Sequence, residues 1–468
     1  MRLKEIDIKK YWVYLFLLFF ITVPWLYADY ISYTILFFAL FAFILYKFDI
    51  PKFPLILFII ALLLRIGVVL CIKTPPQSDF LLLYEGSQGV LEGDFSFLNR
   101  NYFQKWAYQT GFVLYQSVLL RICNKILFLK LVNCILSSLT VVLVYLTAKE
   151  FAGKKAAAWV SLVYCILPFP LTLVTVLTNQ IPATFLLYLG IYIIISSKIN
   201  LNSYIRYLIF ALLTAFSNVL RPEGIIPILA VVLFLILTFN KKSIKETCIN
   251  LLIVVSVYFL TFEMISLLFK ITGMSPLGLT NNASYWKFVL GFNHETSGKY
   301  SSADMYVIGN EDAAYALIKE RIFVPIGQLK ELFINKINVF WNSCALHWSF
   351  SYIKSGLYLF GKEFQIKEFV VLLEKANVFA MNIIYAASIY GVFANIRKKV
   401  CDYRFLYFMN MVFITFGVYL LIEVQPRYAY NIQPAVFILA ALGISAVAKW
   451  VEGKKSKFKH IEEGKNDE

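Results

Sequence analysis

One carboxylate in this sequence stands where a general base could act. Asp79 lies in the polar segment 75–95, a few residues after a long apolar run, and the aromatic segment 101–112 follows it. An apolar run of about 20 residues spans a bilayer, so it would hold Asp79 close to the membrane surface. A lone loop aspartate is more often simply solvated. The membrane anchorage and the aromatic neighbours favour a base that takes a proton from a substrate hydroxyl group.

No second carboxylate is evidently paired with Asp79 in the sequence, and this limits the classes of reaction that Asp79 could catalyse. Hydrolysis of an ordinary glycosidic bond needs an acid as well as a base. A sugar attached to a phosphate needs no acid, because the phosphate leaves as an anion that cations stabilise. The pattern therefore favours transfer of a sugar from a phosphate leaving group.

Two arginines can supply such cations. Arg221 and Arg427 each lie in a short link between apolar runs, beside a proline and near an acidic residue, Glu223 or Glu423. Both links are expected outside the cell, where Lys and Arg are otherwise scarce. Snorkelling to lipid headgroups is the alternative for each arginine alone. Because arginine binds phosphate through two parallel hydrogen bonds, the pair favours phosphate binding.

Two further ionisable residues lie inside apolar runs. Arg65 and Glu263 would cost roughly 2.5–3.5 kcal/mol each at the centre of a membrane helix, so each is expected to face a partner or a cavity. A structural ion pair or backbone carbonyl groups would suffice. The seven cysteines form no CxxC pair and the three histidines are dispersed, so the sequence supports neither a metal site nor a disulfide framework.

The elements that must position these residues are twelve apolar runs. Only 15% of the 468 residues are charged, against about 25% in soluble domains, and 60% are hydrophobic. The chain is therefore expected to be an all-α polytopic membrane protein. The predicted spans are 11–28, 30–48, 53–72, 126–148, 156–177, 181–197, 204–220, 224–239, 249–271, 376–394, 405–422 and 432–450.

The charges between these runs predict their orientation. With the N-terminus inside, every second link carries Lys or Arg, whereas the short outer links hold only Arg221 and Arg427. Cytoplasmic loops are enriched in Lys and Arg, so both termini are expected inside and the polar residues named above outside. The net charge of +16 then reflects these loops, and nucleic-acid binding is not expected.

Two long segments divide the chain. Residues 73–125 and 272–375 both fall on the outer side, and 111–123 is too short an apolar stretch to span, so it predicts an interfacial helix. The expected organisation is two extra N-terminal helices (1–52), a catalytic membrane core (53–271) with its first outer loop (73–125), a large outer loop (272–375), C-terminal membrane helices (376–450) and a basic cytoplasmic tail (451–468).

The order of short motifs resembles the bacterial GT-C glycosyltransferases, in particular the protein O-mannosyltransferase and aminoarabinose-transferase-like group. The resemblance covers residues 53–450 and rests on order and topology. It is carried by Arg65 in its span, SDF at 78–80, Tyr84, Gly89, the aromatic YQTGF at 108–112, the RPEG turn at 221–224, the FW pair at 340–341 and the RY turn at 427–428.

The resemblance implies a function and roles for residues. Such enzymes move a sugar from a polyprenyl-phosphate donor to an envelope acceptor (protein, lipid or wall polymer) on the outer face, usually with inversion and often without a metal. Asp79 would be the base. Many members have an Asp-Glu pair here, whereas Phe80 follows Asp79, so no cofactor is expected, and a divalent metal is an alternative that the sequence does not support. The expected donor-phosphate ligands are Arg221, Arg427 and Lys105, and the expected sugar and acceptor contacts are Tyr84, Tyr108, Gln109, Glu223 and Tyr428.

Other functions remain open from the sequence. A transporter or flippase of lipid-linked sugars would show internal repeats and polar groups at mid-membrane, and here only the Pro168–Pro170 kink points that way. A structural envelope protein would not depend on Asp79 or Arg221. A polymerase or ligase of whole glycans would use the same site on a larger substrate.

Overall fold

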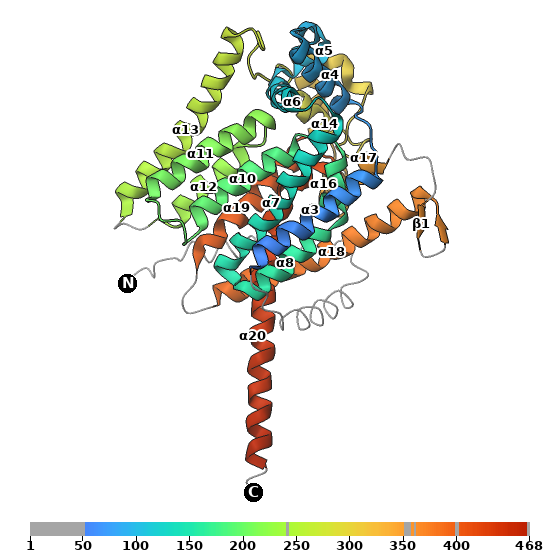
Figure 1. Ribbon diagram of the computed structural model, residues 1–468. Coiled ribbons are helices and arrows are strands. Elements are labelled where there is room, and N and C mark those ends of the chain that lie inside the picture. The colour runs from blue at the N-terminus through green and yellow to red at the C-terminus, as the bar shows by residue number, and fades with distance from the viewer. Residues whose placement is uncertain (1–51, 240–242, 351–356, 360–361, 398–401, 466–468) are drawn as a thin grey trace.

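The fold is built almost entirely from helices. The computed structural model describes residues 52–239, 243–350, 357–359, 362–397 and 402–465. Figure 1 shows a slanting bundle of long helices with shorter helices gathered at one end. The expected all-α fold is confirmed. A small antiparallel hairpin is the exception, formed by strands β1 (Leu357–Leu359) and β2 (Lys362–Phe364).

Six of the described helices are long and apolar enough to cross a membrane. They are α3 (Phe53–Cys71), α7 (Ile126–Ala152), α11 (Ser203–Leu220), α13 (Ile244–Ile271), α18 (Ile366–Ile396) and α20 (Gln433–Lys465). Three shorter apolar helices also coincide with predicted spans, namely α10 (Gln180–Ile195), α12 (Ile225–Leu237) and α19 (Leu406–Leu421). The chain is a multi-pass membrane protein. The predicted spans 11–28 and 30–48 lie outside the described residues, and the count of twelve is not confirmed.

The span predicted at 156–177 is a bent pair of helices. α8 (Lys154–Ile166) is followed by α9 (Pro168–Thr172) and the 3-10 helix η4 (Leu173–Thr175), at an angle of 55°. Leu167 between them has a ψ of 124°, because a residue that precedes a proline avoids the helical conformation. After the bend, Thr175 Oγ1 accepts a hydrogen bond of 3.2 Å from Thr74 Oγ1, just beyond the end of α3.

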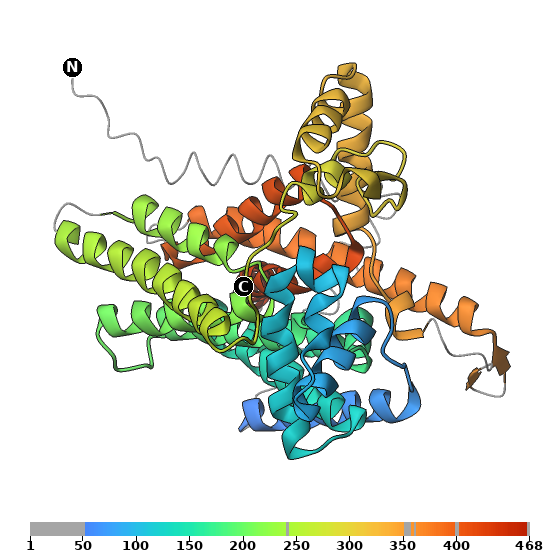
Figure 2. The ribbon, with the colours of Figure 1, turned by 90° about the horizontal axis from the view of Figure 1, so that it is seen from above.

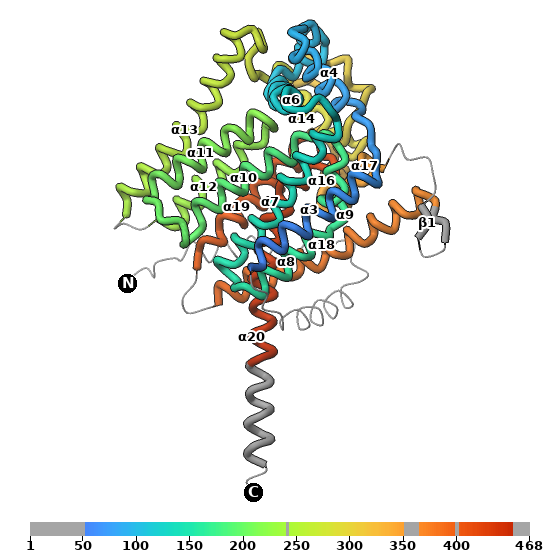
Figure 3. Tube along the Cα trace, viewed as in Figure 1, coloured from blue at the N-terminus to red at the C-terminus, as the bar shows by residue number. Residues whose placement is uncertain are grey.

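Close helix contacts hold the bundle together. The trace in Figure 3 shows α3, α7 and α8 side by side, as their contacts require. The α18–α20 pair packs most closely, and a Cβ atom added at Gly443 would lie 2.0 Å from the carbonyl oxygen of Ala387. Small residues at such crossings let two helix backbones approach in a membrane. These contacts fix the spans whose ends carry the polar residues.

Two sets of short helices cap one end of the bundle. The first set lies between α3 and α7: α4 (Asp79–Glu92), η2 (Ser96–Asn99), α5 (Asn101–Lys105), η3 (Ala107–Gln109) and α6 (Thr110–Ile122), the helix predicted at 111–123. The second set follows α13: α14 (Trp286–Gly291), η6 (Ala303–Val307), α15 (Glu311–Ile322), α16 (Ile326–Trp341) and α17 (His347–Phe350). Seen from above in Figure 2, the blue and cyan first set and the gold second set lie on different sides of the bundle.

The link between α19 and α20 reaches the same end as the two caps. It contains the 3-10 helix η8 (Pro426–Asn431). The opposite end of the bundle gathers links that were predicted to be cytoplasmic: Arg404, in η7 (Tyr403–Phe405), donates a hydrogen bond of 2.8 Å to the carbonyl oxygen of Ile195, and Glu150 accepts one of 2.6 Å from the Ser197 hydroxyl. These three links therefore meet at the end opposite the caps, and their cytoplasmic location stays a prediction.

Candidate functional site

Three cations from distant parts of the chain surround one aromatic ring. The ring of Tyr428, in η8, lies 5.2 Å from the Arg221 guanidinium carbon, 5.5 Å from that of Arg427 and 5.7 Å from Lys287 Nζ. Cations within about 6 Å of a ring are attracted to its face. Together with Asp79, Glu223 and Glu423, these four residues form the charged cluster. Of the cations, Arg221 and Arg427 were predicted to converge, and the structure places them together.

Asp79 enters this cluster as the first residue of α4. The residue before it, Ser78, has φ 50° and ψ −133°, a conformation that residues with a side chain rarely adopt. The ring of Phe80, directly after it, lies 5.2 Å from the Arg427 guanidinium carbon. Among the described residues, no hydrogen bond or ion pair holds the Asp79 carboxylate. It is the one carboxylate of the charged cluster that has no such partner in the described chain.

The surroundings of Asp79 raise the pKa of its carboxyl group. Burial is the main cause, and the charges of Arg427 and Lys287 oppose it, whereas that of Glu423 adds to it. A carboxyl group with a raised pKa is a stronger base than a free aspartate. The position and electrostatics of Asp79 are therefore those that a general base needs.

Arg427 keeps much of its hydrogen-bonding capacity free. Its Nε donates to Gln425 Oε1 at 2.8 Å, and its backbone carbonyl accepts a hydrogen bond from Gln180 Nε2. Its guanidinium group lies against Phe80 on one side and against Trp348, at 5.0 Å, on another. In the described chain no carboxylate is ion-paired with it. Such a group can bind an incoming phosphate through its remaining N–H donors.

Arg221 is instead paired with a carboxylate. Its Nε donates to Glu223 Oε1 at 2.7 Å, and its Nη1 donates to Asn179 Oδ1 at 3.2 Å. Glu223 also accepts hydrogen bonds from the Tyr419 hydroxyl, at 2.9 Å, and from Asn431 Nδ2. Arg221 and Glu223 thus tie the link between α11 and α12 to η8. The arginine lines the charged cluster with its charge already balanced.

Lys287 is a member of the cluster that the sequence reasoning missed. It lies on α14 and forms an ion pair with Glu423, whose Oε2 also accepts a hydrogen bond of 3.3 Å from the Tyr428 hydroxyl. Burial by itself lowers the pKa of Lys287. Tyr428 and Glu423 raise the pKa by more than burial lowers it, so the net shift is upward. Its signal in the sequence was a single lysine within the apolar stretch YWKFVLGF of an outer segment.

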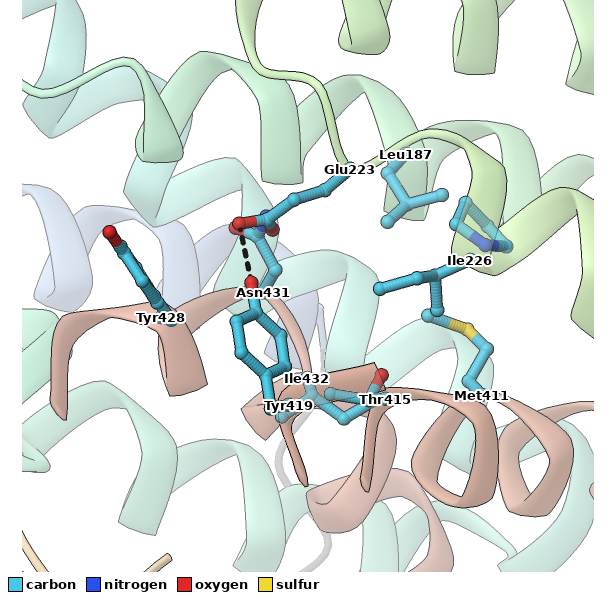
Figure 4. A pocket seen from close by; sticks show the side chains of 10 residues that line it. Leu187, Glu223, Ile226, Met411, Thr415, Tyr419, Tyr428, Asn431 and Ile432 are labelled. Atoms are coloured by element: carbon cyan, nitrogen blue, oxygen red, sulfur yellow. Dashed lines mark hydrogen bonds between the residues drawn. The ribbon is translucent and has the colours of Figure 1, made fainter. Parts of the chain in front are cut away.

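A pocket adjoins the charged cluster between α10, α12, α19 and η8. Its polar end is lined by Glu223, Tyr419, Tyr428 and Asn431, with hydrogen bonds converging on Glu223 (Figure 4). Its other end is apolar, and Figure 4 shows side chains of both ends facing the same space. The apolar lining residues are Leu187, Ile226, Pro227, Met411 and Ile432. The pocket is therefore polar where it meets the charged cluster and apolar away from it.

The remaining predicted contacts are divided by the structure. Burial raises the pKa of Tyr108, and the next largest influences on it are the charges of Lys287, which lowers it, and Tyr428, which raises it. Tyr108 is therefore near the charged cluster. Tyr84 instead accepts a hydrogen bond of 2.8 Å from Gln88, on its own helix. Gln109 has a buried Oε1 atom without a partner in the described chain. Lys105 contacts Asn282 through its backbone: the Lys105 carbonyl accepts a hydrogen bond of 3.0 Å from Asn282 N.

Lys105 as the third cation and Tyr84 as a sugar contact stay predictions, and the contacts described for them do not involve the charged cluster. Lys105 ends α5, where its backbone joins the two caps, and Lys287 takes the third position around Tyr428. Tyr84 lies more than one turn along α4 from Asp79, and it packs with Leu120, Leu129 and Leu177. A helix turns about 100° per residue, so a residue five positions on leaves the face of the first.

The two intramembrane ionisable residues differ. Arg65 is fully buried and donates to Ser137 Oγ at 2.8 Å and to the carbonyl oxygens of Ala61 and Cys165, the kind of partner expected. Glu263 is exposed on α13, and no hydrogen bond or ion pair of its side chain occurs in the described chain, contrary to expectation. It lies about two turns from the end of that helix at Ile271, so its carboxylate can extend toward the membrane surface.

Among the described residues, no group of three or more His, Cys, Asp or Glu side chains could hold a metal ion. The charged cluster contains three cations and three carboxylates. With Asp79 ionised these charges balance, and with Asp79 protonated one positive charge remains. The cluster can accordingly accept an anion together with a proton.

Solved structures that are similar to this chain include the following three. The archaeal oligosaccharyltransferase AglB from Archaeoglobus fulgidus, in complex with an inhibitory peptide and a dolichol-phosphate, matches 88% of this chain and 52% of its own at 14% identity, with a TM-score of 0.46. The apo form of the oligosaccharyltransferase from Archaeoglobus fulgidus matches the same shares at 14% identity, with a TM-score of 0.48. ArnT from Cupriavidus metallidurans, bound to undecaprenyl phosphate, matches 85% of this chain and 78% of its own at 12% identity, with a TM-score of 0.39.

These neighbours are GT-C glycosyltransferases, the superfamily that the sequence resembles. This chain spans about half the length of the two oligosaccharyltransferases. No protein-family model and no curated protein matches the sequence. The function is accordingly inferred from the side chains of the charged cluster and its pocket.

Proposed function

We propose that this chain is an integral-membrane glycosyltransferase that moves a sugar from a polyprenyl-phosphate-linked donor to an envelope acceptor on the extracytoplasmic face. One observation carries the proposal. Asp79 and Arg427, which have no ion-pair partner within the described part of the chain, meet beside a pocket with one polar and one apolar end. A base, a phosphate-binding cation and a place for a lipid chain are the parts that this reaction requires.

The donor would bind with its phosphate at the cations. Arg427 would hold the phosphate directly, and Lys287 and Arg221 would complete a positive wall around Tyr428. These charges stabilise the phosphate as it leaves, which lowers the barrier most if they are already in place. The first units of the lipid chain would lie along the apolar end of the pocket, lined by Ile226 and Met411.

Asp79 would act on the acceptor. Its carboxylate would take the proton of an acceptor hydroxyl group while the oxygen attacks the anomeric carbon. The bond between that carbon and the phosphate oxygen breaks, and the phosphate leaves with the electron pair. Because attack comes from the face opposite the phosphate, the product would have the inverted configuration. The proton remains on Asp79 until it is lost to solvent.

The experiment that tests this function uses the purified full chain in lipid vesicles. It is incubated with a panel of radiolabelled polyprenyl-phosphate sugars and envelope fractions, and the label transferred to an acceptor is measured. Transfer by the wild type that is abolished by Asp79→Asn supports the proposal. Glu92→Gln, at the exposed end of the same helix, is the control and should transfer normally.

The same vesicles separate an enzyme from a transporter. A flippase would move labelled lipid-linked sugar between leaflets without an acceptor. This movement needs no general base, so Asp79→Asn should not abolish it. Rapid movement of the donor across the bilayer, with no transfer to any acceptor fraction, would overturn the proposed function. Transfer of whole glycans in place of single sugars would identify a polymerase or ligase that uses the same cluster.

A further inference from the structure

A buried lysine lies directly behind the charged cluster. Lys336, on α16, is 1% exposed, and its Nζ donates to three backbone carbonyl oxygens: those of Gly291 at 2.7 Å, Leu420 at 2.7 Å and Ile422 at 2.9 Å. An ammonium group has three protons to donate, so all of them are used. In the described chain no carboxylate is ion-paired with it. The sequence reasoning assigned this residue no role.

The three carbonyls belong to two elements that carry residues of the cluster. Gly291 ends α14, which bears Lys287, and Leu420 and Ile422 lie at the end of α19, next to Glu423. The same two elements are joined by a backbone hydrogen bond of 2.7 Å from Glu423 N to the Lys287 carbonyl. The Lys336 ammonium therefore binds both the end of α14 and the end of α19. The place where these two ends meet is called the junction below, and it carries the Lys287–Glu423 ion pair.

Two glycines make room for this arrangement. A Cβ atom at Gly291 would lie 2.3 Å from the Leu421 carbonyl oxygen, so only glycine lets α14 approach α19 so closely. Gly298 has a φ of 76°, and a Cβ atom there would lie 2.8 Å from Lys336 Cδ. Its carbonyl also accepts a hydrogen bond of 2.8 Å from Val424 N. The lysine is enclosed on all of these sides by backbone.

We propose that Lys336 is a positioning residue of the site. Its ammonium group holds the end of α14 against the end of α19, and this fixes Lys287 and Glu423 in place beside Asp79. The proposal rests on the proposed function, since the donor phosphate is the ligand that the positioned cations would bind. Lys336 itself touches no substrate, because its three donors are occupied by the backbone.

The protonation of Lys336 gives this role a measurable signature. Burial lowers the pKa of Lys336 to about 7, although the negative charge of Glu423 opposes the shift. Other charged or titratable groups lie on the elements packed against it: Lys287 on α14, Tyr419 on α19, Arg427, Tyr428 and Tyr430 on η8, and His294, Glu295 and Lys299 in the segment around Gly298. Above this pH the neutral amine keeps two N–H donors for three carbonyls. Its hold on the junction is therefore complete below pH 7 and weaker above it.

The test measures binding of undecaprenyl phosphate to the purified full chain by native mass spectrometry, at about pH 6 and about pH 8.5, on either side of that pKa. We expect the wild type to bind more weakly at the higher pH. Lys336→Met should weaken binding at the lower pH by on the order of tenfold and remove the difference between the two. Lys336→Arg stays charged at both pH values, so it should bind undecaprenyl phosphate equally well at both. Lys330→Met, exposed on the same helix, should match the wild type.

A second measurement does not depend on any ligand. Hydrogen exchange at the amides of Glu423 and Val424 reports whether α14 and the following segment stay joined to the end of α19. We expect faster exchange at both amides in Lys336→Met, and the wild-type rate in Lys330→Met. Unchanged exchange and unchanged binding in Lys336→Met would overturn the positioning role. Faster exchange in Lys336→Met, together with a wild type that binds no undecaprenyl phosphate, would overturn the proposed function and leave the junction role supported. If Lys336→Met does not fold, Lys336→Arg carries the test: its binding and exchange should stay the same at the two pH values at which those of the wild type differ, and an equal difference in both proteins would overturn the positioning role.

Discussion

The guanidinium carbon of Arg427 lies 5.0 Å from the centre of the Trp348 ring. The arginine comes from η8 and the tryptophan from α17, and Phe80 of α4 approaches the same guanidinium group at 5.2 Å. An aromatic face attracts a cation without neutralising it. Arg221 and Lys287 are instead neutralised by Glu223 and Glu423. The geometry therefore makes Arg427 the cation of the cluster best suited to receive the charge of a phosphate.

This relationship predicts the outcome of Arg427→Lys. Lysine keeps the charge but lacks the planar set of donors that binds two phosphate oxygens at once. We expect the KM for the donor to rise on the order of tenfold, because one of two hydrogen bonds to a charged group is lost. Steady-state kinetics with a fixed acceptor measure this. Arg121→Lys, exposed on α6, is the control, and an unchanged KM in Arg427→Lys would exclude Arg427 as the phosphate ligand.

Asp79→Asn tests the base. Removal of a general base typically lowers a rate by about 10²–10⁴-fold. Asparagine has nearly the same shape, and the Asp79 carboxylate has no hydrogen-bond partner in the described chain, so the fold should persist. We expect kcat to fall by that factor while the melting temperature stays close to wild type. The affinity for undecaprenyl phosphate should be kept or rise, because the substitution removes a negative charge from the cluster. Transfer at a near-normal rate would remove Asp79 from the mechanism.

The charges around Asp79 predict a shift in the pH profile. Burial raises the pKa of Asp79, and the negative charge of Glu423 raises it further. A base works only when deprotonated, so kcat/KM should rise with pH through this raised pKa. Glu423→Gln removes the negative charge and leaves Lys287 unneutralised, and both changes lower the pKa of Asp79. The acid limb should therefore move to lower pH, as measured by rates across the acid range, and a move to higher pH would contradict this electrostatic account.

Much of the site could be predicted because membrane spans restrict where loops can lie. Asp79, Arg221 and Arg427 stand close to the ends of apolar runs, so the spans alone place them at one end of the bundle. The alternation of charges then indicates which links share that end. Because these links share one end of the bundle, residues far apart in the sequence, such as Arg427 and Phe80, can come into contact there.

The rest could not be predicted, because it depends on how the long outer segments fold back. Lys105 and Lys287 are both single lysines in such segments, and nothing in their local sequence says which one reaches Tyr428. The choice depends on the junction between α14 and α19, where close backbone contact at Gly291 and the buried Lys336 bring Lys287 to Glu423. Contacts between segments distant in sequence, made through backbone carbonyl groups, leave no local pattern.

The backbone of Ser78 yields a prediction that separates stability from activity. Its φ of 50° and ψ of −133° cost a residue with a side chain about 1–3 kcal/mol, and glycine adopts them freely. Glycine also makes the unfolded chain more flexible, which costs about 0.4–1 kcal/mol. We therefore expect Ser78→Gly to stabilise the protein by about 1 kcal/mol, seen as a higher melting temperature.

If the strained turn aims the Asp79 carboxylate, the same substitution should lower kcat and leave the KM for the donor unchanged. Ser78→Ala is the matched control, since it keeps the strain and removes a hydroxyl group that does not cap α4. Its melting temperature and kcat should both match the wild type. A Ser78→Gly protein that is no more stable than Ser78→Ala would show that the turn carries no strain. Full activity in a more stable Ser78→Gly protein would show that the strain does not serve the base.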